Sequence, residues 1–75
     1  MIQHKYIRLP QFDEIIIFPE VIQHLKFKHM NPISAGFCHI NTDTQEIRCH
    51  GESISLNLKS KKEDSNIATK QFFYI

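Results

Sequence analysis

The chain lacks most of the features that mark an enzyme with a nucleotide cofactor or a membrane protein. It has two glycines in 75 residues, too few for a GxGxxG phosphate-binding loop and too far apart in the chain for a GxxxxGK loop. Its longest uninterrupted apolar run is Ile15 to Phe18, far short of the ~20 residues that span a bilayer. The N-terminus shows no basic segment followed by an apolar one, which argues against a secretory signal. We therefore expect a cytoplasmic protein without membrane contact, with Cys38 and Cys49 as free thiols.

The chain also lacks an excess of charge of either sign. Nine Lys/Arg residues stand against eight Asp/Glu residues, which leaves a net charge of +1. Proteins that bind the phosphate backbone of nucleic acids usually carry a clear excess of Lys and Arg over Asp and Glu. The one basic cluster is Lys59, Lys61 and Lys62, followed at once by Glu63 and Asp64. It is interpreted either as a solvated helix entry or as a contact for phosphate or an acidic protein.

A catalytic or metal-binding set is not apparent in the sequence. At this length we expect a single domain, residues 1–75, whose core is too small to enclose a substrate. The Cys38-His39 and Cys49-His50 pairs suggest zinc, which needs about four converging N or S ligands. Neighbouring strand residues point to opposite faces, however, so each face of a hairpin would offer two ligands at most. We predict no enzyme activity, no metal and no cofactor.

Hydrophobic periodicity predicts an α+β fold, a small antiparallel sheet of three to five strands with a short central helix and a C-terminal helix. Residues 33–40 and 45–50 alternate around a polar turn and predict a β-hairpin. Residues 4–9 predict an edge strand, residues 14–18 a strand buried on both faces, and residues 54–58 a third strand or an extended arm. A helix is predicted over about 20–30 and another from about Lys61, where Ser60 to Glu63 matches a capping box. Residues 71–74 alternatively form a strand. Both helices are expected to cover one face of the sheet.

The predicted core consists of apolar residues that fall in phase on these elements. They are Ile16, Phe18, Val21, Ile22, Leu25, Ile33, Phe37, Ile40, Ile47, Leu56, Ile67 and Phe72. The two glycines have positional interpretations: Gly36 suggests a bulge or the close approach of another backbone, and Gly51 a positive φ after the hairpin.

Four stretches of the chain carry a resemblance. They are Ile33-Ser34-Ala35-Gly36-Phe37, the run Cys49 to Leu56, the run Ser60 to Ser65, and Ile17-Phe18-Pro19 before a short His-containing helix. In these stretches the chain resembles small phage and prophage proteins that have no assigned activity. The resemblance implies a mobile-element protein made in a bacterial cytoplasm, and it supplies no catalytic residues. Small proteins of that origin often act as inhibitors or adaptors of host complexes, including anti-defence factors.

Two functions remain open on this evidence. The first is a non-catalytic protein-binding module, an inhibitor or adaptor of a host protein or complex. The alternative is a small nucleic-acid-binding regulator that uses Lys59, Lys61 and Lys62, with Lys26 and Lys28 as further contacts. A homodimer is also expected, because Phe72, Phe73, Tyr74 and Ile75 cannot all point into one small core. Phe73 and Tyr74 are the predicted partner contacts, and the alternative to a homodimer is that this patch is reserved for the host partner while the free protein is a monomer.

Overall fold

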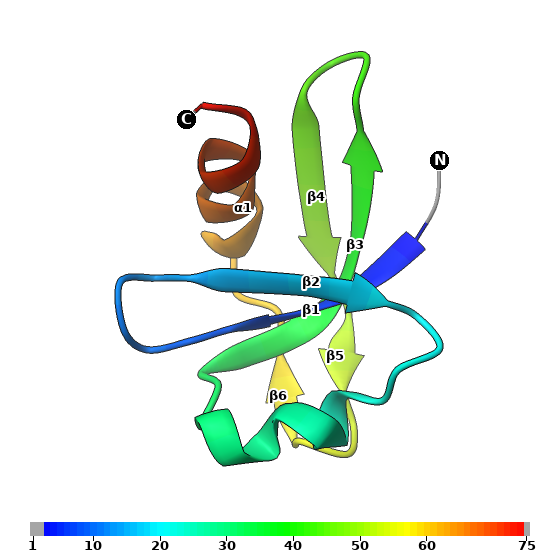
Figure 1. Cartoon of the computed structure of the whole chain (residues 1–75), viewed down its shortest axis with the longest axis vertical. Coiled ribbons are helices and arrows are strands. Elements are labelled where there is room, and N and C mark those ends of the chain that lie inside the picture. Colours follow the sequence, from blue (N-terminus) through cyan, green and yellow to red (C-terminus); the bar gives the residue numbers. More distant parts are fainter. Residues whose placement is uncertain (1–2, 75) are drawn as a thin grey trace.

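The computed structural model describes residues 3–74, and Ile75 of the predicted dimer contact lies outside them. The elements in chain order are strands β1 (Gln3–Arg8) and β2 (Ile15–Pro19), the 3-10 helix η1 (His24–Met30), strands β3 (Ser34–Asn41), β4 (Glu46–His50), β5 (Glu52–Ser53) and β6 (Leu58–Lys59), and helix α1 (Asp64–Phe73). The predicted α+β fold is confirmed (Figure 1).

The four long strands form one antiparallel sheet in the order β2-β1-β3-β4, and β5 and β6 pair as a separate small hairpin. The hairpin of β3 and β4 is the one predicted, with Cys38 opposite Cys49 and Ile40 opposite Ile47. The prediction that residues 4–9 form an edge strand is wrong. Strand β1 lies inside the sheet, where it pairs with both β2 and β3. A charged residue in the strand suggested that one face of it meets solvent. In the structure the Arg8 side chain is buried, and its charge is paired with the carboxylates of Asp13 and Asp64.

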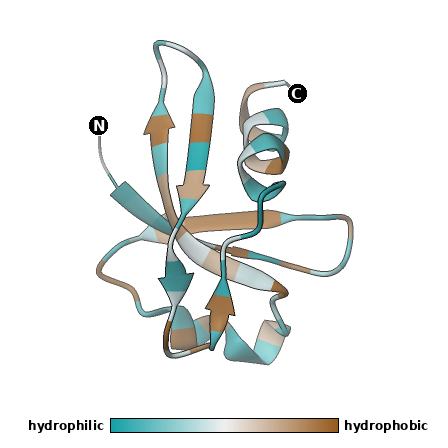
Figure 2. Cartoon of the chain, turned by 180° about the vertical axis from the view of Figure 1, so that it is seen from behind, coloured by the Kyte–Doolittle hydropathy of each residue, from teal (hydrophilic) through white to brown (hydrophobic). Residues whose placement is uncertain are grey.

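The sheet is covered on both faces by different elements. On one face Tyr6, Ile15, Cys38 and Ile47 pack against Ala68 of α1. On the other face Ile7, Phe18 and Ala35 pack against side chains from η1 and from the β5–β6 hairpin, among them Phe27, Met30, Leu56 and Leu58. The expectation that both helices share a face is therefore wrong. β2 contributes to both cores, as its continuous apolar run predicts, and Figure 2 shows β2 as a mostly hydrophobic strand.

The helix predictions are right in position and wrong in detail. The central helix begins at His24, not near residue 20, and it is a 3-10 helix with about three residues per turn. The α-helical spacing that placed Val21 and Leu25 inside therefore does not apply, and both are exposed. The C-terminal helix begins at Asp64, not Lys61, and Glu63 at its N-cap makes no side-chain capping bond. Residues 71–73 are helical, so the strand alternative for them is wrong.

Residues 54–58 form no third long strand. Most of them lie in the turn that joins the two-residue strands β5 and β6, and Asn57 takes a positive φ of 56°. Of the predicted core, Phe18 and Ile47 are buried, Val21, Leu25 and Phe72 are exposed, and the others are half-buried. The buried residues that the pattern missed are Tyr6, Ile7, Ile15, Ala35, Cys38 and Ala68.

Candidate functional site

One part of the sheet is left uncovered and carries a row of three rings. The strand register places Phe37 between Lys5 of β1 and His50 of β4, and His39 opposite Gln3. The Phe37 and His50 rings stack, with centroids 6.1 Å apart and planes at 27°. The His39 ring meets His50 edge-on at 5.1 Å. These three residues are called the ring row below.

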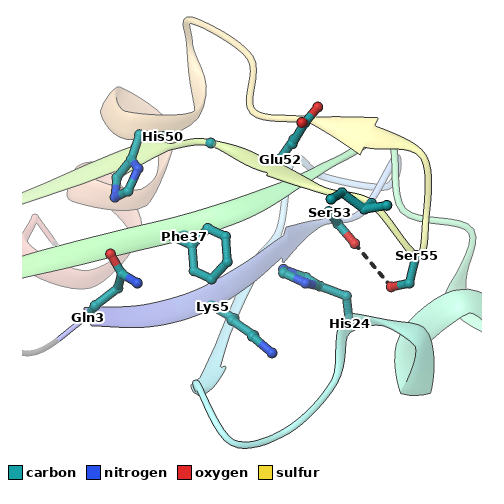
Figure 3. A pocket seen from close by; sticks show the side chains of 10 residues that line it. Gln3, Lys5, His24, Phe37, His50, Glu52, Ser53 and Ser55 are labelled. Atoms are coloured by element: carbon teal, nitrogen blue, oxygen red, sulfur yellow. Dashed lines mark hydrogen bonds between the residues drawn. The ribbon is translucent and has the colours of Figure 1, made fainter.

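A hollow of about 570 Å³ opens at the Phe37 end of the ring row. Phe37 lies in the middle of this pocket, with His50 and Gln3 on one side and His24 on the other (Figure 3). The turn between β5 and β6 contributes the remaining wall, including Ile54, whose side chain is 87% exposed. The pocket therefore combines an aromatic wall with a freely accessible aliphatic side chain.

The polar groups of the pocket are largely committed to the fold. His24 is buried, and its Nε2 lies 2.9 Å from the Gly36 carbonyl oxygen, to which it donates. Burial lowers the pKa of His24, and the nearby Lys5 charge adds to this lowering. The Lys5 ammonium donates to the Ile22 carbonyl oxygen at 3.0 Å. A neutral, bonded imidazole and an occupied ammonium favour a structural wall over acid–base chemistry.

Both glycines shape this pocket. Gly51 has a φ of 77°, and a Cβ there would lie 3.1 Å from the Phe37 ring. A Cβ at Gly36 would overlap the His50 carbonyl oxygen and come within 3.3 Å of the Gly51 backbone. The predicted positive φ at Gly51 and the predicted close approach at Gly36 are both confirmed. Together they let the chain bend over β3 between β4 and β5.

A second hollow, of about 670 Å³, lies between β4 and α1 at the other end of the ring row. It shares His50 with the first hollow, and His39, Arg48 and Tyr74 also line it. Tyr74 directly follows α1, and its side chain is 66% exposed. His50 thus lies between two hollows, one toward η1 and the β5–β6 turn and the other toward α1.

The sequence-predicted site residues lie on β6, on the segment before α1 and at the end of α1. Lys59 lies in β6 opposite Glu52, while Lys61 and Lys62 are exposed in the segment before α1, next to Glu63. Phe73 packs against the core beneath α1, so of the two predicted aromatic contacts Tyr74 is the accessible one. The ring row itself was missed, although the predicted hairpin already placed His39 and His50 on one face.

The two thiols lie on the α1 side of the hairpin, away from the imidazoles. Cys38 is buried, Cys49 is half-buried, and both are free. Burial raises the pKa of the Cys38 thiol to about 11 and that of the Cys49 thiol to about 12. Among residues 3–74, no three His, Cys, Asp or Glu side chains are grouped as metal ligands.

Comparisons with known proteins give no match: no family model, no curated protein and no solved structure is similar to this chain. Within the described part of the chain, neither helix has the length and apolar character needed to cross a membrane.

Proposed function

We propose that the chain is a non-catalytic protein-binding module that acts as an inhibitor or adaptor of a host protein or complex. The observation that carries this proposal is Ile54, an aliphatic side chain 87% exposed beside a pocket walled by Phe37. An exposed apolar group next to an apolar hollow is the usual composition of an interface centre. The resemblance to phage and prophage proteins supports a bacterial cytoplasm as the setting and an anti-defence role as one use of such binding.

The size of the molecule is consistent with this function. The described surface amounts to 5132 Å². A protein–protein interface of standard size takes about 800 Å² from each partner, which is about one sixth of this surface. A contact centred on Ile54 would extend over the pocket and the ring row. Enough surface remains elsewhere for a second contact.

The test is affinity capture from a bacterial lysate with three immobilised forms: wild type, Ile54→Ser and Tyr74→Ser. Both substitutions remove an exposed apolar side chain, so neither is expected to unfold the chain. If the pocket is the contact, Ile54→Ser loses a specifically retained protein that wild type and Tyr74→Ser keep. Loss with Tyr74→Ser alone would move the contact to the C-terminal side. Retention by all three forms would place the contact elsewhere on the molecule, and the absence of any specifically retained protein on the wild-type chain would refute the proposal.

A second candidate function, single-stranded nucleic-acid binding, is favoured by the ring row. Stacked rings on an open sheet face accept bases, and Lys5 and Arg48 flank the row in the strand register. The predicted cluster Lys59, Lys61 and Lys62 would supply phosphate contacts. Fluorescence anisotropy with a labelled oligonucleotide between 50 and 200 mM salt tests it, because phosphate contacts weaken steeply over that range. His50→Ala should weaken oligonucleotide binding if bases stack on the ring row. Lys62→Ala should weaken it and reduce its salt dependence if that lysine contacts phosphate.

A further inference from the structure

The turn between β1 and β2 presents the most exposed large apolar side chain of residues 3–74. This side chain belongs to Phe12, and it is 95% exposed. The turn lies at one end of the sheet, whereas the pocket lies near β5 and the start of β1 at the opposite end (Figure 1). Phe12 therefore belongs to a surface separate from the one proposed above.

The backbone at Phe12 is strained. Phe12 has a φ of 59° and Asp13 a φ of 49°, both in the left-handed region. Glu14 N–H donates to the Gln11 carbonyl at 3.4 Å, which closes a four-residue turn. Turns with two successive positive φ values favour Asn and Gly at these positions, and a bulky residue there is rare. Phe12 makes no buried contact that would compensate for this strain, so its presence points to a role outside the fold.

The turn is also held rigid. Leu9 N–H donates to the Glu14 carbonyl at 2.8 Å, and Arg8 Nη2 lies 2.8 Å from Asp13 Oδ1. Arg8 Nη1 lies 3.0 Å from Asp64 Oδ1, at the first residue of α1. The side chain at the tip is thus mounted on a turn anchored to the main body. Such preorganisation lowers the entropic cost of binding.

We infer that Phe12 is an anchor that inserts into an apolar pocket with a cationic rim on a partner protein. The turn residues 10–14 contain Asp13 and Glu14 and no cation, and Glu63 joins them through Arg8. Lys61 and Lys62 precede Glu63 in the chain and lie on the α1 side of this cluster, where the Lys61 N–H donates to Asp64. The carboxylates of Asp13, Glu14, Glu63 and Asp64 stand against the single guanidinium of Arg8, so a partner pocket would meet a net negative surface beside the turn. With the Ile54 pocket at the opposite end, the chain is an adaptor with two docking surfaces, an inference that rests on the proposed protein-binding function.

The first experiment separates docking from a structural role and needs no partner. Asn accepts the left-handed conformation better than Phe, and the ring is exposed. Phe12→Asn should therefore raise the thermal denaturation midpoint or leave it unchanged. A lowered midpoint would show that the ring supports the fold and would overturn the inference.

The second experiment identifies the occupant. The photo-crosslinker p-benzoylphenylalanine is placed at position 12, at position 54 and, as a control, at Thr42, an exposed residue in the β3–β4 turn. A partner protein should be crosslinked from position 12 and not from position 42, and the crosslinked peptide should map to an apolar segment flanked by Lys or Arg. Crosslinks between two copies of the chain, equal labelling from position 42, or no product from position 12 would overturn it. Products from position 54 alone would leave the proposed function standing, whereas no products from either position would remove both.

Discussion

The side-chain amide of Gln71 makes both backbone hydrogen bonds of Ile15. Its Nε2 donates to the Ile15 carbonyl oxygen at 2.8 Å, and the Ile15 N–H donates to its Oε1 at 2.8 Å. Ile15 lies in the edge strand β2, so one glutamine replaces a missing neighbouring strand. On the opposite edge, Thr69 bonds both backbone groups of Ile47, and Ser65 both of Cys49. Helix α1 therefore satisfies backbone groups at both edges of the sheet, where they would otherwise invite pairing with other chains.

Removing the amide should loosen this edge. We expect Gln71→Ala to lower the free energy of unfolding by about 1–2 kcal/mol, because two backbone groups lose their partner. Hydrogen exchange at the Ile15 amide should accelerate at the same time. Lys70→Ala, an exposed neighbour on α1, is the control and should change neither quantity. Unchanged exchange at Ile15 in Gln71→Ala would contradict the capping role.

The sequence predicted the elements where periodicity alone decides, as in the β3–β4 hairpin and the C-terminal helix. It failed where tertiary contacts decide. Arg8 and Asp64 read as surface charges, yet they are buried because each satisfies the other. Ile54 alternated like a strand residue, yet it lies exposed in a turn, because Ser53 and Asn57 favour local hydrogen bonding and a positive φ. Pro10, Asp13 and Glu14 predict a solvated turn at this point of the chain, but nothing at Phe12 predicts a positive φ, because a bulky residue rarely adopts one.

Asp64 is the most consequential buried polar residue. Its carboxylate is fully buried and accepts bonds from the Tyr6 hydroxyl, from Arg8 at 3.0 Å and from the Lys61 N–H at 2.9 Å. Asp64→Ala should lower the free energy of unfolding by about 3–5 kcal/mol, because it leaves a buried arginine with less compensation. The matched control is Glu63→Ala, whose carboxylate also meets Arg8 but is exposed. Urea unfolding measures the free energy of unfolding of both variants. A similar decrease for Glu63→Ala and Asp64→Ala would contradict the special role of the buried carboxylate.

The stability of the fold should depend on pH through His24. Burial holds the folded-state pKa of His24 below its unfolded value of about 6.5, so the unfolded chain binds the proton more readily. Its contribution is therefore complete above pH 6.5 and is lost as the pH falls from there through the folded-state pKa. Unfolding free energies measured at pH 7.5 and 5.5 should show the decline in wild type. His24→Gln should flatten it, whereas replacement of the exposed His29 should not; an equal slope in His24→Gln would refute the assignment.

The two thiols should resist alkylation while the chain is folded. The pKa of Cys38 is raised to about 11 and that of Cys49 to about 12, so both are protonated at pH 8. Because the thiolate is the reactive form, iodoacetamide should label the native chain about 100-fold more slowly than the chain unfolded in urea. Mass spectrometry counts the labels at each time point. Rapid native labelling of either cysteine would show that the hairpin opens or that the thiol is accessible.

The C-terminal side offers a test of self-association. Phe72, in the last turn of α1, and Tyr74, directly after it, are exposed, and we propose that they meet a second copy of the chain. Sedimentation equilibrium at micromolar concentration should then give twice the monomer mass of 8.9 kDa. Tyr74→Ser should restore the monomer without loss of helical circular dichroism. Phe73→Ser is the informative comparison, because that ring packs against the core and its loss should destabilise the chain instead. A wild-type mass of 8.9 kDa rejects the dimer, and a Tyr74→Ser variant that stays dimeric places the interface elsewhere on the molecule.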